Sequence, residues 1–187
     1  MTINIKTKEW FILFIYILFI LSSLPFMPEI WKILRENFGQ SVTYIPHFLA
    51  MGFFWGFIIY ISCYKKKKLL FYFWLVLFFI IYFLLMEKLE LPAERIHLLE
   101  YGLLGYFTYR ALENDLTKKS IYLWAPFLVL CVSILDEGIQ YLLPNRVGDL
   151  KDTFLNEVSG ILGLMITGLI IRSEYPIIKE NKNKPSI

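Results

Sequence analysis

Long uninterrupted apolar runs are the feature that most constrains the fold of this chain. They recur along most of its 187 residues, and hydrophobic residues make up 57% of the composition while charged residues make up only 19%. A helix needs about 20 predominantly apolar residues to cross the hydrocarbon core of a bilayer. The chain is therefore predicted to be an all-α, polytopic integral membrane protein.

The apolar runs predict about six transmembrane helices. Three of them are short for a full span, which indicates thinned lipid or interfacial anchoring by aromatic residues, and an arrangement with one re-entrant segment also fits. The first run lacks a small-residue cleavage site, so it is interpreted as a retained span rather than a signal peptide. The expected spans are residues 10–24, 42–64, 69–86, 97–112, 120–143 and 153–171.

Lysine and arginine predict the orientation of these helices. Thirteen of the nineteen fall in the two termini and the loops on the same side, and six fall in the other loops. Because cytoplasmic segments carry the excess of basic residues, both termini are expected to be cytoplasmic. The run Lys65–Lys68 is interpreted as a topological anchor, with a lipid or partner site as the alternative. A net charge of +3 is too small to indicate a nucleic-acid partner.

An internal repeat of fifty residues relates two parts of the chain. PHFLAMGFFWGF aligns with IHLLEYGLLGYF, so that His47 meets His97, and MEKLEL aligns with DEGIQY, so that Glu87 meets Glu137. Two helical hairpins repeated in the same orientation would form a parallel repeat. Chance matching among apolar letters is the alternative.

The repeat divides the chain into three regions. Residues 1–46 are predicted to hold the first helix and an outer segment, in which PEIWKILRENFGQS predicts a short amphipathic helix that is either a connector or a lid. Residues 172–187 are a cytoplasmic polar tail. The region between them is the membrane domain, residues 47–171, with repeat units of about 47–92 and 97–143 and a last helix at 153–171.

Ionisable side chains gather in DEGIQYLLPNRVGDLKDTFLNEVSG, residues 136–160, and at the start of the preceding hairpin. The predicted orientation places them at or just below the outer face, and such groups usually face a protein interior or a wet cavity. Helical spacing puts Glu94, His97 and Tyr101 on one face. The predicted polar pocket comprises Glu94, Arg95, His97, Glu100, Tyr101, Glu137, Gln140, Arg146, Asp149, Asp152 and Asn156, with a secondary site at His47 and Glu87.

Other interpretations of these residues stay open. Glu137 could instead form a structural ion pair with Arg146 or Arg95, and His97 could be a satisfied interfacial histidine. The stripe Asn156, Gly160, Gly163 and Thr167 is typical of closely packed helices. No HExxH, CxxC, GxSxG, P-loop or GxGxxG pattern occurs, and the two cysteines fit packing positions. No metal or cofactor is therefore predicted.

The pattern Glu137-x2-Gln140-x3-Pro144-x-Arg146-x2-Asp149-x2-Asp152-x3-Asn156-x3-Gly160-x2-Gly163 resembles the signature of the VanZ-like family of bacterial membrane proteins. RIHLLEYGLLGY is similar to the upstream His and Tyr helix of that family, and the likeness covers roughly residues 94–171. Many members carry an Asp-Lys pair four and three residues before the histidine, whereas Glu94 and Arg95 lie three and two residues before His97 here.

The resemblance implies a multi-pass protein of the bacterial cytoplasmic membrane that takes part in cell-envelope protection. The family's namesake is associated with resistance to the glycopeptide teicoplanin. The expected partners are the lipid bilayer and, at the outer face, a lipid, a lipid-linked precursor or a glycopeptide. The alternative is a membrane hydrolase or transferase acting on an outer-leaflet lipid or envelope precursor, with Glu137 as general acid or base, His97 as its partner and Arg146 as an anion clamp. A transporter is a third option.

Overall fold

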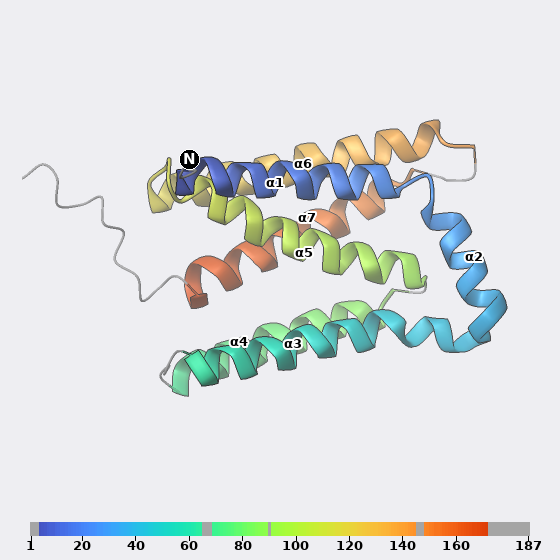
Figure 1. Ribbon diagram of the computed structural model, residues 1–187, viewed down its shortest axis with the longest axis horizontal. Coiled ribbons are helices and arrows are strands. Elements are labelled where there is room, and N and C mark those ends of the chain that lie inside the picture. The colour runs from blue at the N-terminus through green and yellow to red at the C-terminus, as the bar shows by residue number, and fades with distance from the viewer. Residues whose placement is uncertain (1–3, 65–68, 90, 145–147, 172–187) are drawn as a thin grey trace, which may run out of the picture.

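The computed structural model describes residues 4–64, 69–89, 91–144 and 148–171, and every regular element in these ranges is a helix. This confirms the all-α prediction for the described part of the chain. Helices α1, α3, α4, α5, α6 and α7 run along the long axis of the molecule, and α2 crosses one end of them (Figure 1). The elements are α1 Ile5–Ser23, α2 Met27–Phe38, the 3-10 helix η1 Gly39–Tyr44, α3 Ile45–Tyr64, α4 Leu69–Glu87, α5 Pro92–Leu112, α6 Lys118–Leu142, α7 Leu150–Met165 and the π-helix η2 Ile166–Ile171.

Local capping chemistry explains several of the helix boundaries. The side chains of Asn4, Thr117 and Asp149 accept hydrogen bonds from backbone N–H groups at the starts of α1, α6 and α7. Pro92 occupies the first turn of α5, where its missing N–H costs nothing. At the end of α2, Gly39 adopts a φ of 58°, which a residue without a side chain does most easily.

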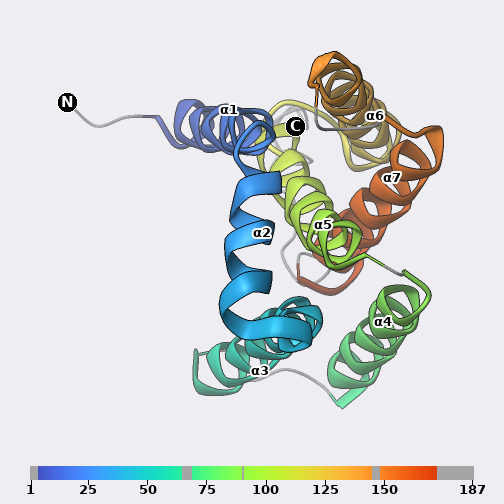
Figure 2. The same cartoon turned by 90° about the vertical axis from the view of Figure 1, so that its right-hand side faces the viewer.

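Helix α5 occupies the middle of the molecule. Figure 2 shows it between α1, α6 and α7 on one side and the pair of α3 and α4 on the other. The largest apolar core joins α1, α5 and α6 through residues such as Leu13, Leu104 and Val129. Helices α3 and α4 are attached to this bundle through a second cluster, in which Phe71, Leu75 and Phe78 contact α7 and η2.

Apolar side chains also cover the outside of the helices. Leu69 of α4 is 85% exposed and Leu123 of α6 is 69% exposed, and Phe14 of α1 is exposed as well. Among the described residues, three helical segments are long and apolar enough to cross a membrane: Met27–Ile59, Leu69–Glu87 and Lys118–Leu142. An apolar exterior over such segments is what a bilayer environment favours. The structure thus has the character of a membrane protein.

Helices α5 and α7 approach each other so closely that their backbones touch. A Cβ atom placed on Gly105 would overlap the carbonyl group of Gly160, and one placed on Gly163 would overlap the carbonyl group of Gly102. The small-residue stripe of the last predicted helix therefore lies where two helix backbones touch, as its composition predicts. A side chain at either position would push α5 and α7 apart.

We expect Gly163→Ala to lower the free energy of unfolding by about 1–3 kcal/mol, because the new methyl group overlaps the Gly102 backbone. Thermal unfolding in detergent, followed by tryptophan fluorescence, measures the change. The matched control is Gly52→Ala in α3, where no heavy atom lies within 4 Å of the new Cβ. That substitution should stabilise the helix by about 0.5–1 kcal/mol. Equal effects of the two changes would contradict the close contact.

Candidate functional site

A buried group of polar side chains lies where α5 and α7 begin and α6 ends. We call it the polar cluster. It connects three helices that meet at one end of the bundle (Figure 1). The polar cluster comprises His97, Glu100 and Tyr101 of α5, Ser133, Asp136, Glu137 and Gln140 of α6, and Asn156 of α7.

The carboxylate of Asp136 is the centre of the polar cluster. Its side chain is fully buried. The hydroxyl of Tyr101 donates a hydrogen bond of 2.8 Å to Oδ2, and the amide of Gln140 donates one of 2.9 Å to Oδ1. A buried carboxylate is tolerated only with such donors, because desolvation without them costs several kcal/mol. Asp136 therefore holds α5 and α6 in register.

Glu137 connects the end of α6 to the start of α7. Its Oε2 atom accepts a hydrogen bond of 2.9 Å from the backbone N–H of Asp149, which is the N-cap residue of α7. Its Oε1 atom lies 3.4 Å from the amide nitrogen of Gln140. Both carboxylate oxygens are thus engaged within the protein. The side chain fixes the direction in which the chain enters α7.

His97 lies among carboxylates on the α5 side of the polar cluster. Its Nδ1 atom is 3.3 Å from Oε2 of Glu100 and 4.0 Å from Oδ2 of Asp136. Both acidic side chains are largely buried, so their charges act on the imidazole through little water. His97 therefore lies beside two carboxylates, one from α5 and one from α6.

Hydrogen bonds from α7 complete the buried network. The amide of Asn156 donates to the hydroxyl of Ser133 at 3.2 Å, and the hydroxyl of Ser159 donates to the carbonyl of Leu98. The hydroxyl of Tyr82, from α4, lies 3.2 Å from that of Ser159. The side chains of Ser133, Asn156 and Ser159 are all buried. The network therefore extends from α6 through α7 to α5 and α4.

Two acidic residues at the start of α7 border the polar cluster. The side chain of Asp149 accepts a hydrogen bond of 2.9 Å from the N–H of Lys151, which caps α7. Partial burial raises the pKa of the Asp152 carboxyl above its ordinary value, and the negative charge of Glu94 acts in the same direction. Glu94 itself lies near the N–H of Leu91, at 3.4 Å, and caps α5. These residues surround the cluster with negative charge.

Arg95 does not join the polar cluster, although it belongs to the predicted pocket. Its guanidinium donates to the carbonyl of Leu89 at 2.7 and 3.1 Å and to the carbonyl of Thr43 at 3.1 Å. It thus binds two connecting segments, one before α3 and one after α4. No ion pair with Glu137 forms through Arg95. Arg146, the other predicted basic residue of the pocket, lies outside the described residues.

The predicted secondary site contains a direct contact between α3 and α4. The Nε2 atom of His47 is 2.9 Å from Oε1 of Glu87. This pair occupies the same end of the molecule as the polar cluster, since α3 begins there and α4 ends there (Figure 1). Glu87 is half exposed, unlike Asp136 and Glu137. The pair is therefore a simpler and wetter contact than the polar cluster.

The polar cluster is rich in acceptors and contains one imidazole. Its chemistry suits hydrogen-bond donors and positively charged groups. Among the described residues, no group of three or more His, Cys, Asp or Glu side chains is arranged to hold a metal ion. The chain matches no family model, no curated protein and no solved structure.

Sequence reasoning missed two members of the polar cluster. Asp136 was absent from the predicted pocket, although it accepts more side-chain hydrogen bonds there than Glu137 does. Its spacing of four residues from Gln140 was a usable signal, because such residues are neighbours on a helix. Ser133 gave no comparable signal, since a lone serine in an apolar helix is common.

We expect Tyr101→Phe to lower the free energy of unfolding by about 1–3 kcal/mol, because the buried Asp136 carboxylate loses a donor. Thermal unfolding of the purified protein measures the difference. The matched control is Tyr141→Phe on α6, whose side chain is 79% exposed, and its stability should stay within about 0.5 kcal/mol of the parent. A Tyr101→Phe protein as stable as the control would contradict the hydrogen bond.

Proposed function

We propose that this chain is a VanZ-like protein of the bacterial cytoplasmic membrane, with six spans, cytoplasmic termini and a parallel internal repeat. Its proposed function is protection of the cell envelope, including resistance to teicoplanin. The polar cluster would bind a polar group of a glycopeptide, a lipid or a lipid-linked precursor at the outer face. The observation that carries the proposal is the buried network around Asp136, together with the distribution of basic residues in the sequence.

The hydrogen bonds favour binding over catalysis by Glu137. A general base needs a free oxygen that can reach the substrate proton. Both oxygens of Glu137 face donors of the protein, the N–H of Asp149 and the amide of Gln140. In this arrangement Glu137 acts as a positioning residue that sets the entry of α7. Recognition by the cluster would instead involve His97, Glu100 and the surrounding acidic groups.

The second candidate is a membrane enzyme that modifies an outer-leaflet lipid or envelope precursor. The observation in its favour is the position of His97, whose Nδ1 atom lies 3.3 Å from Glu100 and 4.0 Å from Asp136. A histidine oriented by a carboxylate is the arrangement that general acid–base catalysis uses. In the enzyme, His97 would exchange the proton and Asp136 would orient it.

The first prediction of the proposal concerns teicoplanin susceptibility in a sensitive bacterial host. The wild-type chain should protect, and Asp136→Asn should reduce protection through a loss of ligand binding of about tenfold or more, because an amide N–H group replaces one of the two acceptor oxygens that Tyr101 and Gln140 use. Glu87→Gln is the matched control and should keep protection, since its half-exposed side chain lies outside the polar cluster. All proteins are compared at equal membrane levels.

Two outcomes of this experiment separate the candidates. If the cluster only binds, the wild-type chain protects without any change in envelope lipids, and Glu137→Gln keeps this protection because a glutamine oxygen still accepts from Asp149. If the protein is an enzyme, wild-type membranes show a change in envelope lipids, and His97→Gln abolishes that change. A wild-type chain that gives no protection contradicts the proposed resistance function.

The proposed orientation predicts which side of the membrane exposes Cys63. This cysteine is exposed near the end of α3, next to the basic run that the positive-inside rule places in the cytoplasm. In a Cys131→Ser background, an impermeant maleimide should label Cys63 in inverted membrane vesicles and leave it unlabelled in intact cells. Labelling of intact cells would reverse the proposed orientation.

A further inference from the structure

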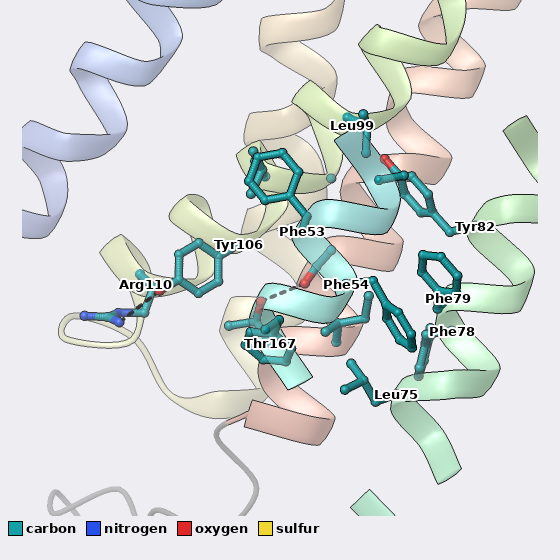
Figure 3. A pocket seen from close by; sticks show the side chains of 16 residues that line it. Phe53, Phe54, Leu75, Phe78, Phe79, Tyr82, Leu99, Tyr106, Arg110 and Thr167 are labelled. Carbon is teal, nitrogen blue, oxygen red and sulfur yellow. Dashed lines mark hydrogen bonds between the residues drawn. The ribbon is translucent and has the colours of Figure 1, made fainter. Parts of the chain in front are cut away.

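A cavity of about 530 Å³ lies between the pair α3–α4 and the helices α5 and α7 (Figure 3). Its volume is in the range of sites that hold small molecules. It opens on one side and is not a closed internal void. Its walls come from α3 and α4 on one side and from α5, α7 and η2 on the other. We call it the α3–α5 cavity.

The wall of the α3–α5 cavity is mostly hydrocarbon and aromatic. Figure 3 shows Phe54, Phe78 and Phe79 together on one side, with Tyr106 and Arg110 on the other. Phe54 and Phe79 stack with ring centroids 3.9 Å apart. Gly102 and Gly163, where α5 and α7 touch, also line the cavity and present no side chain to it.

The polar side chains of the wall already have partners. Tyr82 contacts Ser159, and Thr167 donates to the carbonyl of Gly163 at 2.7 Å. Arg110 donates to the hydroxyl of Tyr106 at 3.2 Å and forms ion pairs with Glu9 and Glu113. Two carboxylates therefore balance one guanidinium, which leaves no excess positive charge for an anionic group. The wall selects for an apolar occupant.

The α3–α5 cavity lies on the opposite face of α5 from the polar cluster. Leu99, Gly102, Leu103, Tyr106 and Arg110 of the wall follow helical spacing along one stripe. His97 and Tyr101 fall on the other side of the same helix, against α6. The cavity is thus separate from the site of the proposed function. An occupant of one need not touch the other.

We propose that the α3–α5 cavity binds one hydrocarbon chain of a membrane lipid. The helices that form its outer walls expose large apolar side chains and include a segment able to cross a bilayer, so hydrocarbon chains surround them. An unfilled apolar cavity forfeits dispersion contacts along its whole lining, and an acyl chain restores them. A mostly apolar wall favours an acyl chain over ordered water, which needs several polar partners.

The test uses a phosphatidylcholine that carries a photoreactive diazirine on one acyl chain. The full-length protein is equilibrated with vesicles containing this lipid, transferred into detergent, washed and irradiated, so that only retained lipid reacts. We expect the label on peptides of α3 and α5 that line the cavity, residues 53–57 and 99–106. An excess of unlabelled phosphatidylcholine should compete with it.

Leu103→Trp fills the cavity and should reduce retained label by about fivefold or more, because the added rings occupy the space of the chain. The matched control is Leu123→Trp on the exposed surface of α6, which should label like the parent. Glu137→Gln should also label like the parent, because the polar cluster lies on the other face of α5. This comparison separates failure of the cavity proposal from failure of the proposed function.

A second variant covers the case in which Leu103→Trp does not fold. Leu103→Cys, in a background with Cys63→Ser and Cys131→Ser, adds no bulk before folding and is alkylated with benzyl maleimide afterwards. Alkylation should remove the label from the cavity peptides. The proposal is overturned if no lipid is retained, if α6 is labelled as strongly as the cavity peptides, or if neither filling treatment lowers the label.

Discussion

The backbone contact between α5 and α7 is the constraint on which the positions of α6 and α4 depend. Glycines on both helices let the chains approach until a single methyl group would not fit. Because α7 occupies one side of α5 so closely, α6 can present Asp136 to Tyr101 on one face, and α4 can reach Ser159 through Tyr82. Membrane helices gain no hydrophobic driving force from each other in lipid, so such tight packing is a main source of their association.

The polar cluster adds specificity to this packing at an energetic cost. Burying Asp136 and Glu137 disfavours folding unless each oxygen meets a donor, and the structure supplies those donors from three helices. Misplacing one helix would leave a carboxylate without partners in a region of low dielectric. The network therefore penalises wrong arrangements of α5, α6 and α7 more strongly than it stabilises the correct one. A recognition site gains rigidity from the same property.

Much of the fold could be predicted from the sequence, because apolar runs and the residues that begin or end helices act locally. The apolar run at 69–86 became α4, Leu69–Glu87, and the amphipathic segment after the first helix became α2. The expected span at 42–64 started late, since Gly39–Tyr44 forms a 3-10 helix before α3. The predicted pocket named His97, Gln140 and Asn156, and the structure places these residues on α5, α6 and α7 respectively. The role of Arg95 and the α3–α5 cavity could not be predicted, because both depend on how segments distant in the sequence pack together.

Arg95 contacts the two segments through which α3 and α4 are joined to the rest of the chain. Thr43 precedes α3 and Leu89 follows α4, and the guanidinium of Arg95 donates hydrogen bonds to both of their carbonyls. One side chain of α5 therefore ties the chain before α3 and the chain after α4 to the bundle, while Phe71, Leu75 and Phe78 hold the other end of the α3–α4 pair against α7 and η2. The apolar cavity beside α5 lies between these two attachments.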